Sequence, residues 1–451
     1  MSFGFRSPAL ALWLVFFAPA ALAAQTVPAK LTLEEALAIA RERNPTYRQA
    51  VNDLNTASAD LRAGWGSFLP GVSASLGFGA SNFRVVTGED DFGQPRMLPE
   101  PREFQSSSAS QSIGASLVLF DGLRTFHTLR SAKAAAAAAE AKRVNQLNAL
   151  EAETTRRFYQ AVAASRLVEL EERLLAAARE QLAFTERLFN LAGAQQEDVL
   201  GAQIDVANQE LAIERARAQR VKSLLALKEQ LGITEDISFE VEGELPQPVD
   251  PDRLDAEEVV ARALSASPRV VELERSRDAA RASAAAQSGQ RWPTVRASAG
   301  ISRSMSLSSY EALFQFNPRN RGFSFGFSLE FPLFTQFRTT AAVTRAEVQA
   351  RNAEESVRAG RLLVEREVRS ALVDLKNAYR AVELAERTAE LSRQRVRLAT
   401  ERYRIGQMTF TNLQQIIAQA AQSERQVLQA RLDAAIARVT LEEKVGAPLP
   451  F

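Results

Sequence analysis

The chain contains two copies of one structural plan, and this duplication restricts its fold more than any other feature. Shifting the 451-residue sequence by 223 positions aligns matching residues of the two halves, such as Leu31 with Leu254, Pro45 with Pro268, Pro70 with Pro293 and Gly77 with Gly300. Further along, a shift of 214 aligns Phe120 with Phe334, Arg124 with Arg338 and Gly232 with Gly446. A repeat of this length predicts two similar supersecondary units. We place them at residues 25–239 and 253–451, joined by an acidic, proline-rich linker at 240–252.

Each repeat contains two long stretches of helix-favouring sequence. Between Gly122 and Gly193 there is neither glycine nor proline, and Ala, Leu, Glu, Arg and Gln dominate, which are strong helix formers. In the second repeat, apolar residues recur every seven positions, the spacing of a coiled-coil seam, at Leu384, Leu391, Leu398 and Ile405. We therefore predict one antiparallel helical hairpin per repeat, over about 123–231 and 335–445, with tips at 191–196 and 405–411.

Four short segments alternate apolar residues with Ser and Gly, at about 71–83, 111–120, 293–302 and 322–331. A period of two predicts strands. Each is about the nine to eleven residues that a tilted strand needs to cross a bilayer. The alternative is a small soluble sheet with one buried face.

Four strands cannot close a barrel, so a membrane barrel would need strands from several chains. Eight strands from a dimer would leave little channel, whereas twelve from a trimer would leave a lumen. That lumen would be lined by the small polar faces plus Arg296 and Glu330. Polar loops at about 84–105 and 304–321 would link the strands on the far side of the membrane.

The first residues have the pattern of a signal peptide. Arg6 precedes an apolar run at 9–17, and small residues follow at 18–24. The run is too short to span a hydrocarbon core, which needs about 20 residues. We expect residues 1–24 to be removed by cleavage after Ala23 or Ala24, and the chain to be exported.

Composition excludes several classes of function. The 55 Lys and Arg residues are balanced by 54 Asp and Glu and interspersed with them, so no basic face is available for nucleic acid. The chain has no cysteine and one histidine, His127, which we expect at the surface rather than as a ligand. Disulfides, thiolate sites and the usual zinc sites are thereby excluded. Nucleotide and hydrolase motifs are also absent from the sequence, so we predict no enzyme activity, cofactor or metal.

Several segments, taken in order, resemble the TolC-type outer-membrane efflux channels. They are 31-LTLEEALAIARERNP-45, Leu69-Pro70, 119-LFDG-122, 333-LFTQ-336 and 403-YRIGQMTFTNLQQI-416. The resemblance implies a mainly α-helical chain with a transmembrane β-barrel. It implies a homotrimer with a 12-stranded barrel in the lipid of the outer membrane and a 12-helix tunnel in the periplasm.

The same resemblance implies the channel component of a tripartite efflux or type I secretion system. Such a channel is a passive conduit that works with an inner-membrane transporter and a periplasmic adaptor. A different class of function, an exported periplasmic coiled-coil scaffold without a pore, remains as the alternative. The exported substrate, whether drug, metal ion or protein, is left open because selection belongs to the pump.

The resemblance also implies a gate at the periplasmic mouth. In family members that hold the mouth closed, restraining contacts involve an aspartate, a tyrosine and an arginine. Asp198 and Tyr403 match the first two, whereas Met408 replaces the arginine. Two acidic rings of the family would fall at Asn412 and Gln415, which are uncharged.

The hairpin tips are the expected docking points for the adaptor. In the first hairpin Ala192 stands where the family has glycine, and Gly193 follows it. In the second hairpin Gly406 matches, and glycine permits the left-handed backbone of a tight turn.

Overall fold

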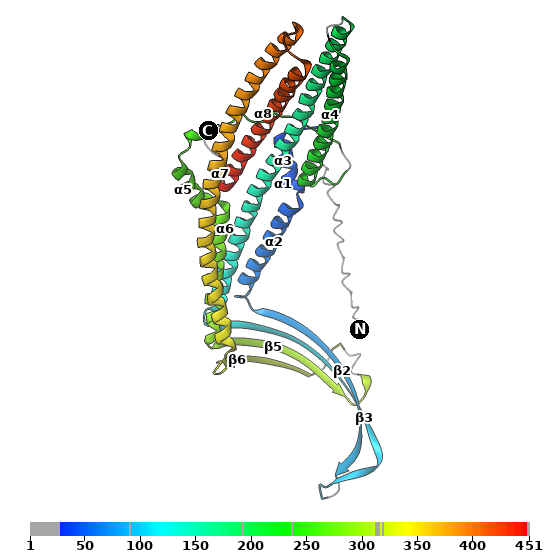
Figure 1. The fold of residues 1–451 in the computed structure, drawn as a ribbon. Coiled ribbons are helices and arrows are strands. Elements are labelled where there is room, and N and C mark those ends of the chain that lie inside the picture. The colour runs from blue at the N-terminus through cyan, green and yellow to red at the C-terminus, as the bar shows by residue number, and fades with distance from the viewer. Residues whose placement is uncertain are drawn as a thin grey trace, which may run out of the picture.

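The computed structural model describes residues 28–448, except for 90–91, 192–193, 236–237, 312–315 and 318–319. The predicted signal peptide lies outside the described residues. Long helices stand together above a curved four-stranded sheet, and the order across the molecule is α7, α8, α3 and α4 (Figure 1). None of the described helices has the length and apolar composition needed to cross a membrane.

The two helical hairpins match each other residue for residue in length. Helices α3 (Arg124–Asn190) and α7 (Arg338–Arg404) each have 67 residues. Helices α4 (Gln196–Leu231) and α8 (Phe410–Val445) each have 36. Because every boundary in the first hairpin recurs 214 positions later, the duplication read in the sequence extends to the structure. The hairpin turns also fall where the tips were predicted.

Shorter helices that the sequence analysis did not predict precede the strands of each repeat. They are α1 (Leu33–Arg43), α2 (Pro45–Gly66), α5 (Ala256–Ala266), α6 (Pro268–Ser288) and the single turns η1 (Pro251–Arg253) and η2 (Gly289–Arg291). Helix α1 starts at a capping box, in which Thr32 and Glu35 exchange hydrogen bonds. Helix α2 packs along α3, and α6 packs along both α3 and α7. The ends of α3 and α7 near the sheet are therefore braced by the short helices. Toward the tips the long helices pack on one another instead, α3 on α4 and α8, α7 on α8, and Phe184 of α3 on Tyr403 of α7.

The sheet is antiparallel, in the order β2-β3-β5-β6. Its strands are β2 (Gly71–Glu89), β3 (Pro95–Phe120), β5 (Thr294–Leu307) and β6 (Asn320–Glu330). The loop predicted at 84–105 is instead mostly a continuation of the β2–β3 hairpin. The alternation of apolar and small residues stops there, but backbone pairing continues, and Phe83 stacks on Phe104 with ring centroids 5.5 Å apart. Strands β2 and β6 are the sheet edges.

The pairing register places like residues on like faces across all four strands. One row of paired positions consists of Ser75, Ser112, Ser302 and Gly322. The next row points to the opposite face and consists of Ala74, Ile113, Ile301 and Phe323. The sheet therefore has one face of small polar residues and one apolar face, as the alternation predicts.

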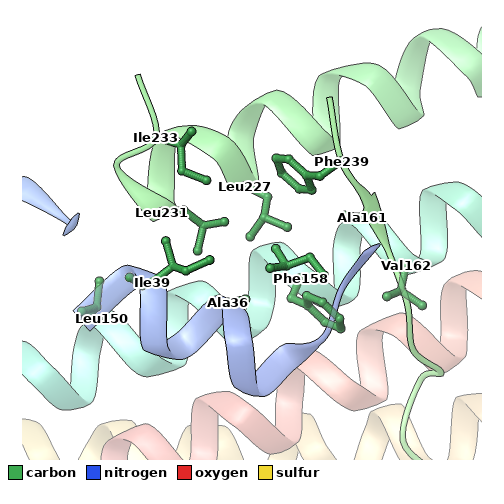
Figure 2. Packing of buried hydrophobic residues seen from close by; sticks show 12 residues of the cluster. Ala36, Ile39, Leu150, Phe158, Ala161, Val162, Leu227, Leu231, Ile233 and Phe239 are labelled. Atoms are coloured by element: carbon green, nitrogen blue, oxygen red, sulfur yellow. The ribbon is translucent and has the colours of Figure 1, made fainter. Parts of the chain in front are cut away.

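Each repeat has its own apolar core where the short helices meet the long ones. Figure 2 shows the first core, in which side chains of α1, α3, α4 and the segment after α4 converge. Two-residue strands β1 (Lys30–Leu31) and β4 (Glu240–Val241) pair in parallel beside it, so part of the predicted linker is structured. The second core lies at equivalent positions. For example, Leu227 and Leu441 are equivalent and fully buried.

The heptad stripe predicted as a seam is not buried within the chain. Leu384, Leu391, Leu398 and Ile405 are all more than half exposed. The buried face of this part of α7 is formed instead by Val382, Ala389, Ala399 and Tyr403. The sequence alone cannot tell an intrachain seam from an interchain one, because both require the same spacing. The outward side of α4 likewise exposes apolar residues, at Leu200, Ile204, Leu211, Val221 and Leu225.

Candidate functional site

The ends of the two hairpins meet in a small apolar cluster, which we call the tip cluster. Its buried members are Ala202, Ala399, Tyr403, Phe410, Leu413 and Ile416. Side chains of α3, including Phe184 and Leu188, pack against it. The cluster is therefore built from all four long helices and joins the two repeats far from their own cores.

Tyr403 is the centre of this cluster, with 8% of its surface exposed. Its ring lies edge-on to Phe184 at 6.3 Å and tilted against Phe410 at 5.8 Å. No described residue makes a well-formed hydrogen bond to its buried hydroxyl. Burial raises the pKa of Tyr403, and the negative charge of Asp198 raises it further, against a weaker opposing effect of Thr185. The phenol therefore stays neutral at physiological pH.

Asp198, which was grouped with Tyr403 from sequence, thus acts on it through its charge. The carboxylate of Asp198 is already used, since its Oδ2 accepts a hydrogen bond from the backbone N–H of Gln195 at 3.1 Å and caps the start of α4. Met408 is half-buried and packs against the tip cluster. Met408, where the resemblance implies an arginine, therefore adds apolar contact here.

Two further contacts between the hairpins were missed by the sequence analysis. The Nε2 of Gln414 on α8 donates to Oδ2 of Asp205 on α4 at 2.5 Å. One turn earlier, a Cβ on Gly201 would lie 3.1 Å from a ring carbon of Phe410. A glycine inside an otherwise regular helix was the available signal, because it often marks a close approach. Burial raises the pKa of Asp205, although the bond from Gln414 opposes the shift.

Farther from the tips, a buried ion pair joins α3 to α8. Arg425 donates through Nε and Nη2 to the two carboxylate oxygens of Glu171, at 2.6 and 2.8 Å. Gln209 of α4 also donates to Glu171, which is only 3% exposed. Burial alone would raise the pKa of Glu171, but the bonds from Arg425 and Gln209 outweigh it and hold the pKa below its ordinary value.

The predicted mouth residues lie at the exposed end of α8. Asn412 and Gln415 are both exposed and carry no charge. Gly406 adopts a left-handed backbone, with φ of 73°, and closes the turn between α7 and α8. Ala192 and Gly193 lie outside the described residues.

The predicted lumen residues lie on the small polar face of the sheet. Arg296 pairs with Ser328, and Glu330 pairs with Thr294, so the two charges are diagonal neighbours on one face. A shallow hollow on this sheet is lined largely by serine and glycine, including Ser73, Ser298 and Ser324.

Within the described part of the chain, no group of three His, Asp or Glu residues is placed to hold a metal. His127 is half-buried rather than at the surface, beside the ring of Phe126. Its Nδ1 is buried, and no described residue bonds to it.

Comparison with known proteins agrees with this architecture. A family model described as outer membrane efflux protein matches residues 36–233 and 259–447. No sequence among curated proteins matches the chain. The fold is shared with solved channels, of which three have the following similarity. CmeC of Campylobacter jejuni has 14% identity and a TM-score of 0.75, covering 92% of this chain and 85% of that one. VceC of Vibrio cholerae has 16% identity and a TM-score of 0.70, covering 92% of this chain and 96% of that one. MtrE of Neisseria gonorrhoeae has 19% identity and a TM-score of 0.69, covering 92% of this chain and 89% of that one.

Proposed function

We propose that this chain works as a trimeric export conduit, on the premise that it belongs to the outer membrane efflux protein family. Membership makes it an outer-membrane efflux channel, with its helices in the periplasm, and not an enzyme. The periplasmic scaffold considered from sequence is set aside on the same ground. The stoichiometry, the closed barrel, the gate and the docking tips are the parts that we propose.

The two lateral sides of the folded chain support assembly into a ring. On one side of the molecule lie α7 and β6, and on the opposite side lie α4 and β2 (Figure 1). Strands β2 and β6 are unpaired edges, and both α4 and α7 expose apolar stripes. Because these two sides differ, one side of each copy would contact the opposite side of the next. Such head-to-tail contacts form a closed ring when the rotation between copies divides a full turn evenly.

Three copies would supply twelve strands, enough for an open lumen. The observation that carries this proposal is the sheet with one small polar face and one apolar face, in register over four strands. In the ring, Arg296 and Glu330 would face the lumen, and the phenylalanines of β6 would face lipid. Closure would also satisfy the backbone groups of β2 and β6, which a bilayer requires.

The tips would then form the periplasmic mouth. We propose that the tip cluster around Tyr403 holds the mouth closed, helped by Asp198 and Met408. Asn412 and Gln415 would leave its rim uncharged. Gly406, together with the first hairpin's Ala192 and Gly193, would present the turns on which a periplasmic adaptor docks, and the inner-membrane transporter would act through that adaptor.

The test compares two adjacent residues of β6. Phe327→Arg places a charge on the apolar face and should cost about 2–4 kcal/mol of insertion near the midplane. Ser328→Arg places the same charge on the lumen face, directly opposite Arg296, where like-charge repulsion should cost at most about 1 kcal/mol. The measurement is the yield of heat-modifiable oligomer extracted by detergent from outer membranes. Equal yields from the two variants would contradict the barrel.

A further inference from the structure

On β5 and β6 a pair of arginines interrupts the apolar face of the sheet, which β5 continues outward with Met305 and Leu307. Arg303 of β5 pairs directly with Arg321 of β6, and Gln111 of β3 is the next residue in the same row. The row immediately inward on this face is apolar and includes Ile301 and Phe323. Both arginine side chains are exposed. The change from apolar to basic is thus abrupt and involves two neighbouring strands.

The position of this row matches the outer border of the membrane. The helices lie in the periplasm, so the sheet end away from them points outward. Between Phe331, directly after β6, and Arg321 the chain covers about 33 Å of strand. At a tilt of about 40° this is about 25 Å across the membrane, which is the height of the apolar band of outer-membrane barrels. Arg303 and Arg321 therefore lie where lipid headgroups begin.

The arginine pair has no anionic partner in the described part of the chain. Like charges directly opposite each other destabilise a sheet, so the pair requires compensation. The side chain of Arg303 makes one hydrogen bond, from Nη1 to Oδ1 of Asn317 at 2.9 Å. Phe316, next to Asn317, accepts a hydrogen bond from Gln111, so the connection between β5 and β6 lies against this row. The remaining guanidinium N–H groups are available for an external anion.

We propose that Arg303 and Arg321 bind the phosphate groups of a lipid in the outer leaflet. Guanidinium groups hold phosphate by paired hydrogen bonds, and two side by side fit a headgroup with more than one phosphate. The acyl chains of the same lipid would lie on Ile301, Phe323 and the apolar residues below them. The charged pair and the apolar surface together thus fit one amphipathic ligand. A free phosphate would contact only the charged pair. This proposal rests on the proposed function, because it requires the apolar face to contact the bilayer.

The experiment uses the full-length channel purified in detergent and native mass spectrometry. The probe is bisphosphorylated lipid A, compared with lipid A from which both phosphates have been removed. The unmodified channel should retain the bisphosphorylated form, and inorganic pyrophosphate at the same concentration should not displace it. The double variant Arg303→Gln, Arg321→Gln should bind it about tenfold more weakly, the change expected for the loss of charge-assisted hydrogen bonds.

Two further variants make the result decisive. Arg296→Gln removes an arginine from the other face of β5 and should bind the lipid as the unmodified channel does. Replacing Arg303 and Arg321 by lysine keeps both charges but removes the paired hydrogen bonds, and should weaken binding of the bisphosphorylated lipid, though less than the glutamine variant does. If the glutamine variant does not assemble, the lysine variant decides. Unchanged binding in that variant, or an equal loss in Arg296→Gln, would overturn the proposal.

Failure of the proposed function would look different. Recovery of the chain with soluble periplasmic contents would contradict the membrane conduit itself. An oligomer extracted from the outer membrane that does not distinguish the two forms of lipid A would contradict only the arginine site. Displacement by pyrophosphate would show a general anion site and would also count against the lipid.

Discussion

The cores inside the repeats and the seam between the repeats are built from different chemistry. Each repeat core is a closed set of apolar side chains, in which Leu227 and Leu441 occupy equivalent positions. The contact between the hairpins includes the polar pairs Glu171 with Arg425, Asp205 with Gln414 and Arg156 with Glu443, in addition to the tip cluster. Separating an apolar core exposes apolar surface to water, which is unfavourable. Buried polar groups, by contrast, can exchange their protein partners for water when helices separate. From this difference we expect that, if the mouth opens, the repeats stay intact while the hairpins move apart.

The largest expected effect is in the cores. Leu227→Ala and Leu441→Ala should each reduce the free energy of unfolding of the helical part by about 2–5 kcal/mol, because each leaves a cavity. Thermal unfolding followed by circular dichroism measures the loss. Lys222→Ala, on the exposed side of α4, is the control and should change little. If one leucine variant is tolerated and the other is not, the two cores are not equivalent.

The second prediction concerns the buried ion pair of the seam. Glu171→Ala leaves Arg425 without its partner and should weaken the closed arrangement by about 3 kcal/mol. Planar-bilayer recordings should show a larger open fraction, with oligomer yield unchanged. Glu386→Ala removes an exposed pair with Arg431 inside one hairpin and should have an effect below about 1 kcal/mol. The same gating in both variants would show that the pair between the repeats has no special role.

The two seam carboxylates should respond to pH in opposite directions. The pKa of Asp205 is raised above its ordinary 3.8, so protonation favours the closed seam as pH falls through that raised pKa. The pKa of Glu171 is lowered below 4.5, so its contribution is present above pH 4.5 and is lost as pH falls through the lowered pKa. Acidification should therefore decrease the open fraction through Asp205 and increase it through Glu171. Asp205→Asn should remove the decrease alone, and a decrease that persists in this variant would contradict the assignment.

The smallest effect is expected at the tip. Gly406 has a left-handed backbone, with open space where a side chain would lie, so Gly406→Ile should cost about 1–2 kcal/mol of local strain. Oligomer yield should stay normal, while co-purification with the periplasmic adaptor should fall. At Gly232, φ is 69° and a Cβ would lie 2.5 Å from the carbonyl oxygen of Arg43, so Gly232→Ala should lower stability instead. Loss of oligomer in Gly406→Ile would make the turn structural.

Local patterns predicted the elements well, and long-range contacts much less. The long helices and the faces of the strands follow from composition and period, which depend on neighbouring residues. The heptad stripe at Leu384 and Leu391 was predicted to be a packing seam, but within the chain these residues are exposed. Continuation of the β2–β3 hairpin beyond residue 83 was missed because backbone pairing does not require alternation. Of the tip residues, Tyr403 and Met408 could be placed from sequence.

The contacts of Asp205 and Glu171 could not be placed, since each joins residues more than 200 positions apart. Nothing in a single sequence distinguishes these carboxylates from the many others on the helix surfaces. Only the arrangement of the two repeats brings Gln414 and Arg425 opposite them.

The unequal bracing of the long helices makes each hairpin a lever. The repeat cores hold each hairpin at its base, where α4 and α8 end. From there to the tip, each of these helices has 36 residues, or about 54 Å. A rotation of about 5° at that pivot moves the end of such an arm by about 5 Å, which follows from the arm length. Side-chain rearrangements at the pivot that are too small to disturb packing can therefore produce a displacement at the mouth as wide as a small solute.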